Sequence, residues 1–464
     1  MVIDRGLAAL RRGLATDAPR WATATIIVAG GLLGLVLNLP GHFTYDSVVQ
    51  LAEGRSGAYS GAHPPVMSWL LGLADAVRPG AAAFVVFDVL LVTGALLAFA
   101  LFEKPGAWLT PPLAAIAFFS PQLLIYPAIV WKDVLFAGSA CAGFACLAWA
   151  AKVWAHRRAR YVLLTAGLAL ATLAALARQN GAIVLPFAGA AVGWMIAADR
   201  GRWRGAAAGG AFAAAGATLT LMASAALDTR LDQANPIGQA WNALHAYDLV
   251  AALAHEPKLE LSVISAHRPR AAELLRTRGV SVYSPRSIDS IEPVQDEING
   301  EGQLSSLIEA QWRALVLRHP LLYLRVRADA FRWVALQPRP LDCVLIETGV
   351  DGPPDELARA GLSERDTSRD DELDAYALGF AGTPVYSHAA YAAVGALLMV
   401  VLWRRRRPAD IVAAAMLASA FAFAASFFVI SVACDYRYLY FLDLAVIAAT
   451  LYASAAFGRR RAPS

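Results

Sequence analysis

Residues 21–39 read WATATIIVAGGLLGLVLNL, a run without a charged side chain. A helix of that length is about as long as the hydrocarbon core of a bilayer is thick, ~30 Å. Four arginines precede the run, which resembles the charged start of a signal peptide. However, the run is too long for a signal core, and no small-residue cleavage site closes it. The stretch therefore predicts a retained first membrane span.

Similar runs recur along the 464-residue chain, which is 58% hydrophobic and only 16% charged. The runs are continuous and do not alternate, so they predict helices and disfavour an outer-membrane barrel. Every backbone amide in the hydrocarbon needs an internal partner, which a helix provides. We expect an all-α polytopic membrane protein with about ten transmembrane helices. The expected spans are 21–39, 81–102, 109–126, 133–151, 161–177, 181–198, 205–227, 384–403, 409–431 and 438–457.

The distribution of positive charge predicts the orientation of these spans. With the N-terminus inside, the inner segments hold 19 Lys and Arg residues. The short outer loops hold five, namely Arg55, Arg78, Lys132, Arg178 and Arg437. The positive-inside rule then favours an N-in, C-in topology. The expected location is a bacterial inner membrane, with the short polar loops facing the periplasm.

Two long segments interrupt the helix series and divide the chain into 1–227, 228–383 and 384–464. Residues 40–80 form a first outer loop, in which the apolar stretch 66–73 is too short to span and is expected along the interface. Residues 228–383 have ordinary polar composition and predict a periplasmic domain or cap. Within it, 303–336 has helical periodicity with a kink expected at Pro320. The acidic stretch 351–374 is expected to be a solvated loop.

Four cysteines are too few for a disulfide framework. Cys141 and Cys146 lie within an apolar run and are expected to pack there. Cys343 and Cys434 both fall on the outer side of the expected topology, so a disulfide between them would fit an oxidising compartment. The sequence alone leaves this pairing open.

Four polar clusters fall on the outer side. They are Tyr45-Asp46-Ser47 with Gly61-Ala62-His63-Pro64-Pro65, Trp131-Lys132-Asp133, Arg178-Gln179-Asn180 and Cys434-Asp435-Tyr436-Arg437. A lipid phosphate lies at this depth and needs cations, which Lys132, Arg178 and Arg437 would supply from three helix ends. The alternative is that each cation reaches water alone.

Asp46 has two interpretations. A carboxylate near the bilayer surface can act as general base toward an acceptor hydroxyl or amine. Alternatively, Asp46 caps a helix that begins at the following apolar residues. His63 is a candidate proton carrier or metal ligand, with Asp133, Asn180 and Asp435 as supporting residues.

No cluster at metal-ligand spacing surrounds His63, so we expect no structural zinc site. A loosely held divalent cation on Asp46, Asp133 or His63 stays open, and no other cofactor is implied. Asp435 and Arg437 could simply form an ion pair. The chain has no glycine-rich nucleotide loop and nothing that suggests nucleic-acid binding.

These motifs resemble the GT-C superfamily of integral membrane glycosyltransferases, which includes protein O-mannosyltransferases and lipid A aminoarabinose transferases. The resemblance rests on Asp46, on the loop ending in His63-Pro64-Pro65, and on Lys132-Asp133. Arg178-Gln179-Asn180-Gly181 and Asp435-Tyr436-Arg437-Tyr438 complete it. It covers 20–230 and 384–457 better than 228–383.

The resemblance implies sugar transfer from a polyprenyl-phosphate sugar to a lipid, glycan or protein acceptor on the outer face. It implies that Asp46 is the catalytic base and that Lys132, Arg178 and Arg437 hold the donor phosphate. Many relatives carry two acids where this chain has Lys132-Asp133, which favours a metal-free, inverting reaction.

Three other functions compete with transfer. A transporter or flippase for a lipid-linked sugar would place ionisable groups within the spans, where only the acids Asp88 and Asp443 lie well inside. A polysaccharide polymerase or ligase would use similar outer arginines and release a pyrophosphate carrier. A scaffold protein would not need four polar clusters on one face.

Overall fold

The computed structural model describes residues 2–60, 63–103, 107–228, 236–299 and 304–456, and Gly61 and Ala62 of the His63 motif lie outside them. Eight helices of the described part are long and apolar enough to cross a membrane, which establishes an all-α polytopic membrane protein. The helices are α1 (Val2–Asn38, apolar from Asp17), α4 (Ala82–Ala100), α7 (Lys132–Lys152), α8 (Arg157–Ala177), α9 (Val184–Arg200), α10 (Arg202–Asp228), α21 (Pro408–Ile430) and α22 (Tyr440–Ala455).

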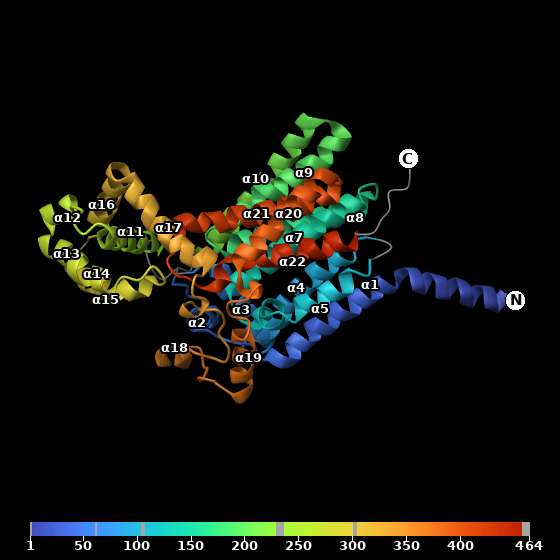
Figure 1. Cartoon of the computed structure of the whole chain (residues 1–464), viewed down its shortest axis with the longest axis horizontal. Coiled ribbons are helices and arrows are strands. Elements are labelled where there is room, and N and C mark those ends of the chain that lie inside the picture. The colour runs from blue at the N-terminus through green and yellow to red at the C-terminus, as the bar shows by residue number, and fades with distance from the viewer. Residues whose placement is uncertain (1, 61–62, 104–106, 229–235, 300–303, 457–464) are drawn as a thin grey trace.

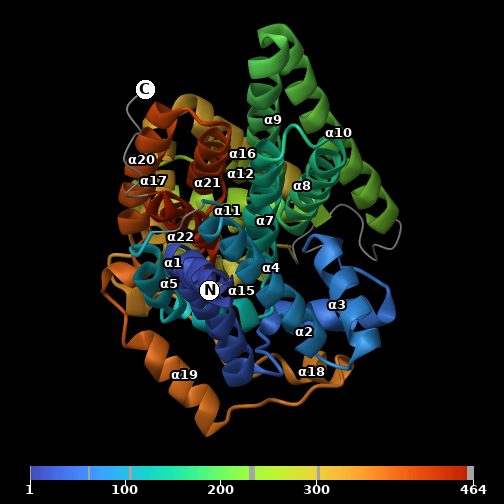
Figure 2. The same cartoon turned by 90° about the vertical axis from the view of Figure 1, so that its right-hand side faces the viewer.

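Helices α7 and α22 form the centre of the bundle. In each, 83% of the most apolar window is buried, and α7 packs against α4, α8, α21 and α22. Helices α9 and α10 instead project as a hairpin beyond the other helices (Figure 2). Gly189 and Gly209 let these two backbones touch, because a Cβ on Gly189 would lie 2.5 Å from the Gly209 carbonyl oxygen.

Two of the ten expected spans differ from the structure. Residues 109–126 do not form one helix but break into α5 (Thr110–Phe118), α6 (Pro121–Leu124) and the 3₁₀ turn η1 (Tyr126–Ala128). Pro121 and Pro127 each start a new short element, since proline cannot continue a helix that needs its N–H. The span expected at 384–403 corresponds to α20 (His388–Arg405), which is not among the eight apolar helices.

The region after α10 contains a separate helical lobe. It comprises α11 (Pro236–His255), α12 (Ser262–His267), α13 (Pro269–Leu274), the π-helical turn η3 (Leu275–Gly279), α14 (Val280–Val282), η4 (Ile288–Ile291), α15 (Glu292–Asn299), α16 (Ser305–Arg318) and α17 (Pro320–Leu336). The single helix expected over 303–336 is two helices, α16 and α17, which separate where the kink was expected, at Pro320. The lobe has its own apolar core and lies at the opposite end of the molecule from the start of α1 (Figure 1).

A buried arginine joins this lobe to the bundle. Arg327 of α17 donates to the Asp248 carboxylate at 2.8 Å and to the backbone oxygens of Phe428 and Ser431 at 3.0 and 2.7 Å. Both charged side chains are fully buried. Asp248 belongs to α11 of the lobe, whereas Phe428 and Ser431 lie at the end of α21, so this arginine connects the lobe to the bundle through its bonds to the two backbone oxygens.

Residues 337–383 form a strap that packs on the main core, with η5 (Pro340–Asp342), α18 (Pro354–Arg359) and α19 (Ser368–Leu378). The expectation of a solvated loop over 351–374 is therefore wrong in part. Asp370 is fully buried, accepts from the Thr367 hydroxyl at 2.7 Å, and lies 3.5 Å from His42. Burial lowers the pKa of His42 to about 4. Asp370, which composition alone would place in a solvated linker, thus completes the capping box of α19 and holds this helix against His42, just after the end of α1.

Candidate functional site

Asp46 lies in the first turn of α2 (Tyr45–Ser56). Thr44 is the N-cap of this helix, and its backbone N–H donates to the Ser47 hydroxyl at 2.7 Å. The capping role that Asp46 could have had therefore belongs to Thr44. The Asp46 carboxylate is left for other contacts, and 26% of its side chain remains exposed.

Three side chains from three different elements surround the Asp46 carboxylate. Arg437 Nη2 lies 3.2 Å from Oδ2, and Lys132 Nζ lies 3.9 Å from the same oxygen. His63 Nε2 lies 3.5 Å from Oδ1. Lys132 begins α7, Arg437 belongs to the turn η7 (Tyr436–Leu439), and His63 precedes α3 (Pro65–Val77). The four residues that sequence reasoning placed on one face thus form one cluster, which we call the Asp46 cluster.

His63 bridges Lys132 and Asp46. Lys132 Nζ lies 2.7 Å from His63 Nδ1, and an ammonium group can only donate, so the ring proton belongs on Nε2 toward Asp46. Burial and the nearby Lys132 charge lower the pKa of His63. The imidazole is therefore neutral. It accepts a hydrogen bond from the Lys132 ammonium group and directs its own N–H toward the Asp46 carboxylate.

Arg437 holds two carboxylates and an aromatic ring. Besides Asp46 it donates through Nε to Asp435 Oδ2 at 3.1 Å, and its guanidinium lies 5.1 Å from the Trp131 ring centroid. Burial raises the pKa of Asp435, while Arg437 opposes that shift. The expected Asp435–Arg437 pair is present, and it occurs within the larger cluster.

Arg178 and Asn180 have other partners. Arg178 forms a buried ion pair with Asp133. The Asn180 amide donates to the Ser426 hydroxyl at 2.7 Å. Arg178 nevertheless lies next to the cluster, because the Tyr438 ring is 5.5 Å from its guanidinium and 5.7 Å from that of Arg437. Of the three expected phosphate ligands, Lys132 and Arg437 both contact the Asp46 carboxylate, whereas Arg178 contacts Asp133.

The charges around Asp46 control its protonation. Burial would raise the pKa of this carboxyl, but the hydrogen bond from His63 and the charges of Lys132 and Arg437 outweigh burial. The net effect is a pKa below the usual range of aspartate. At neutral pH, Asp46 is therefore ionised.

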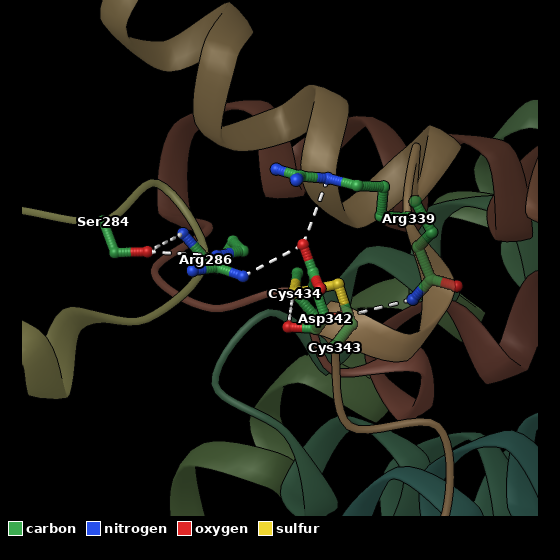
Figure 3. The surroundings of a disulfide bond; sticks show 7 residues. Ser284, Arg286, Arg339, Asp342, Cys343 and Cys434 are labelled. Carbon is green, nitrogen blue, oxygen red and sulfur yellow. Dashed lines mark hydrogen bonds and ion pairs between the residues drawn. A yellow bond between two sulfur atoms is a disulfide. The ribbon is translucent and has the colours of Figure 1, made fainter.

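A disulfide joins the two cysteines whose pairing the sequence left open, and it lies beside this cluster. Cys343 of the strap is bonded to Cys434, with a Cα–Cα distance of 5.3 Å. Figure 3 shows Asp342 next to the bond, between Arg286 and Arg339, each 3.1 Å from its carboxylate. The bond fixes the strap three residues before Arg437.

Glu347 is a residue of this region that the sequence analysis missed. It lies in the strap, close enough to Arg437, Asp435 and Asp46 for all three charges to act on its carboxyl group. No helix end or motif marks it in the sequence. The only signal is its place four residues after Cys343, which indicates a location near the cluster once the disulfide is known.

No group of three or more His, Cys, Asp or Glu placed to hold a metal ion occurs among the described residues. Comparison with protein-family models, with curated proteins and with solved structures finds no match. The fold and cluster therefore define the class, a polytopic α-helical membrane protein with a charged, partly exposed cluster at the ends of several helices.

Proposed function

We propose that this protein transfers a sugar from a polyprenyl-phosphate donor to an acceptor on the periplasmic face of a bacterial inner membrane. The observation that carries the proposal is the convergence of Lys132 and Arg437 on one oxygen of Asp46. Two cations that reach the same point from different elements can also hold one phosphate group. Such a phosphate at the end of a membrane helix belongs to a lipid.

Asp46 would then be the general base. At rest, its cations make it a weak proton acceptor. A donor phosphate that engages Arg437 and Lys132 would draw their charge away from Asp46 and make the carboxylate more basic. Asp46 removes the acceptor proton, the acceptor attacks the anomeric carbon, and the sugar–phosphate bond breaks with inversion. Lys132 and Arg437 stabilise the charge that grows on the departing phosphate, with Arg178 behind them.

Two features support the periplasmic side. The disulfide Cys343–Cys434 lies beside the cluster, and disulfides persist in oxidising compartments such as the periplasm. The inner segments of the expected topology carry most of the Lys and Arg residues. Both features support a periplasmic position for the Asp46 cluster, on the side of the membrane where lipid-linked sugars replace nucleotide sugars as donors.

Asp46→Asn tests the assignment of the base. Full-length protein in proteoliposomes would be supplied with radiolabelled polyprenyl-phosphate hexoses and aminopentoses and with envelope lipids and glycans as acceptors. We expect the variant to transfer the sugar at least about 10²-fold more slowly, because an amide cannot accept the proton. Asp289→Asn is the matched control, since Asp289 is an exposed residue of the helical lobe whose carboxylate accepts from the nearby Ser287 hydroxyl at 2.9 Å, so its replacement should leave the rate unchanged. Full activity of Asp46→Asn would overturn the assignment, and a folded wild type that uses no donor would overturn the proposed function.

A transporter for a lipid-linked sugar is the second candidate, because Asp88 of α4 is buried and neither of its carboxyl oxygens has a hydrogen-bond partner among the residues that the structure describes. Unpaired ionisable groups inside spans are typical of transport pathways. The same proteoliposomes separate the two functions. Transfer gives a new covalent product and free polyprenyl phosphate, whereas transport moves the intact donor to the other leaflet.

A further inference from the structure

The strap segment 343–351 is fixed to two of the chain segments that carry the Asp46 cluster, those of Arg437 and Asp46. On one side, Cys343 is bonded to Cys434, and the Tyr436 N–H donates to the Val344 oxygen at 2.9 Å. These contacts attach the start of the segment to the residues around Arg437. The Tyr126 hydroxyl also donates to the Leu345 oxygen.

On the other side, the end of the segment pairs with the residues before Asp46. The Phe43 N–H donates to the Gly349 oxygen, and the Asp351 N–H donates to the Phe43 oxygen, both at 3.0 Å. The Gly349 N–H donates to His42 Nδ1 at 2.9 Å. Glu347 lies between the two attachment points, so its position relative to Arg437 and Asp46 is set by the backbone on both sides.

The Glu347 carboxyl group is half-buried and has no hydrogen bond or ion pair with any residue of the described ranges. Burial raises its pKa to about 7, and Asp435, Asp46 and Asp351 act in the same direction, while Arg437 opposes them. Glu347 and Asp46 therefore have pKa values on opposite sides of the usual carboxyl range. Such divergence between neighbouring acids is typical of acid–base pairs in active sites.

We propose that Glu347 is a further catalytic residue of the Asp46 cluster and donates a proton to the phosphate oxygen as that oxygen leaves the sugar. This inference rests on the proposed function. Asp46 takes the proton of the acceptor, the new bond forms at the anomeric carbon, and the old sugar–oxygen bond gives its electron pair to the phosphate oxygen. Glu347 protonates that oxygen. The proton on Asp46 then returns to Glu347, which is the stronger base of the two, and the site is reset.

The anionic donor would favour this role. When a phosphate neutralises Arg437, the one charge that lowers the pKa of Glu347 is weakened, and the phosphate itself adds a repulsive charge. Glu347 is therefore protonated in the loaded site. Because the group must be protonated to act, kcat/KM falls as the pH rises through about 7, the pKa of the free enzyme.

A titration that needs no sugar donor tests the coupling first. Infrared difference spectra of the full-length protein in nanodiscs would follow the protonated carboxyl band against pH, with and without decyl phosphate. We expect a group with a midpoint near pH 7 that is missing in Glu347→Gln and that shifts upward when decyl phosphate is added. A band retained in Glu347→Gln, or a midpoint that decyl phosphate leaves in place, would overturn the inference.

Transfer kinetics test the catalytic role. We expect Glu347→Gln to be slower by about 10²-fold or more and to lose the decline in rate above pH 7, while Glu347→Asp keeps part of both. The defect of Glu347→Gln should shrink with donor analogues whose leaving phosphate is a weaker base. Glu364→Gln, an exposed acid of the same strap, is the matched control. If Glu347→Gln keeps the wild-type pH profile, the catalytic role of Glu347 is wrong while the proposed sugar transfer stands. If the wild-type protein transfers no sugar, the proposed function is wrong, and the titration with decyl phosphate then decides whether Glu347 responds to a bound phosphate.

Discussion

Among the single residues of the site, Arg437 contacts the largest variety of groups, namely two carboxylates and an indole ring. Its guanidinium bridges Asp46 and Asp435 at 3.2 and 3.0 Å and lies over Trp131. A lysine at this position would keep the charge but could not reach both carboxylates in a planar fork or stack on the indole. The chemistry of the guanidinium group, and not only its charge, is therefore what the cluster uses.

We expect Arg437→Lys to raise the KM for a polyprenyl-phosphate sugar about tenfold or more, because a charge-assisted hydrogen bond contributes about 1.5–3 kcal/mol. The measurement is the initial transfer rate as a function of donor concentration. Arg286→Lys, which removes a comparable ion pair with Asp342 beside the disulfide, should change KM by less than about twofold since that pair is largely exposed. Equal KM values for Arg437→Lys and wild type would remove Arg437 from the donor site.

The residues of the cluster could be predicted from the sequence to different degrees. Asp46, His63, Lys132 and Arg437 could be found because charges are rare in this chain and each lies close to an apolar run. Their convergence could not be derived, since it depends on how α2, α7 and η7 pack. Glu347 could not be predicted, because it lies in the middle of a polar domain in the sequence. Only the disulfide and the backbone hydrogen bonds on either side of it bring it close to the cluster.

At the element scale, the helices α2 and α3 touch through two glycines. A Cβ on Gly54 would lie 2.3 Å from the Ser68 carbonyl oxygen, and one on Gly72 would lie 2.5 Å from the Gly54 oxygen. This contact sets the spacing between Asp46 at the start of α2 and His63 just before α3. Neither helix can give way cheaply, because the clashing atoms are backbone atoms.

We therefore expect Gly54→Ala to separate α2 from α3 and to destabilise the protein by about 1–3 kcal/mol. Thermal unfolding of the purified protein in detergent measures this, and transfer activity should fall with it. Gly94→Ala in α4 is the control, since a Cβ there meets no atom within 4 Å and should leave the melting temperature unchanged or slightly raised. Similar melting temperatures for the two variants would show that the α2–α3 contact does not fix the site.

That the apolar runs form helices was predictable from their length and continuity in the sequence, while the places where a helix breaks were not. Residues 109–126 are apolar enough to suggest one span, yet Pro121 and Pro127 divide them. The acidic stretch 351–374 suggested a loop because composition cannot show that Asp370 caps α19 and lies buried beside His42. In both cases, local hydrogen bonding overrides average hydropathy.

At the scale of the whole molecule, the fold consists of a membrane bundle, a helical lobe with its own core, and a strap that returns from the lobe to the bundle. The start of α1 and the lobe lie at opposite ends (Figure 1). The Asp46 cluster lies where the strap, the first loop and the last span meet. Hydropathy and charge bias predicted the membrane bundle, but the strap could not be predicted, because its contacts are made by residues far apart in the sequence.

We propose that the Asp46 cluster binds a lipid phosphate at the membrane surface. The most direct test is a cryo-electron microscopy structure of the full chain in nanodiscs with decaprenyl phosphate. We expect phosphate density between Lys132 and Arg437, at the level of the lipid headgroups and on the side of the helical lobe. Phosphate density elsewhere on the bundle, with the contacts of Asp46 to Lys132 and Arg437 unchanged, would contradict it.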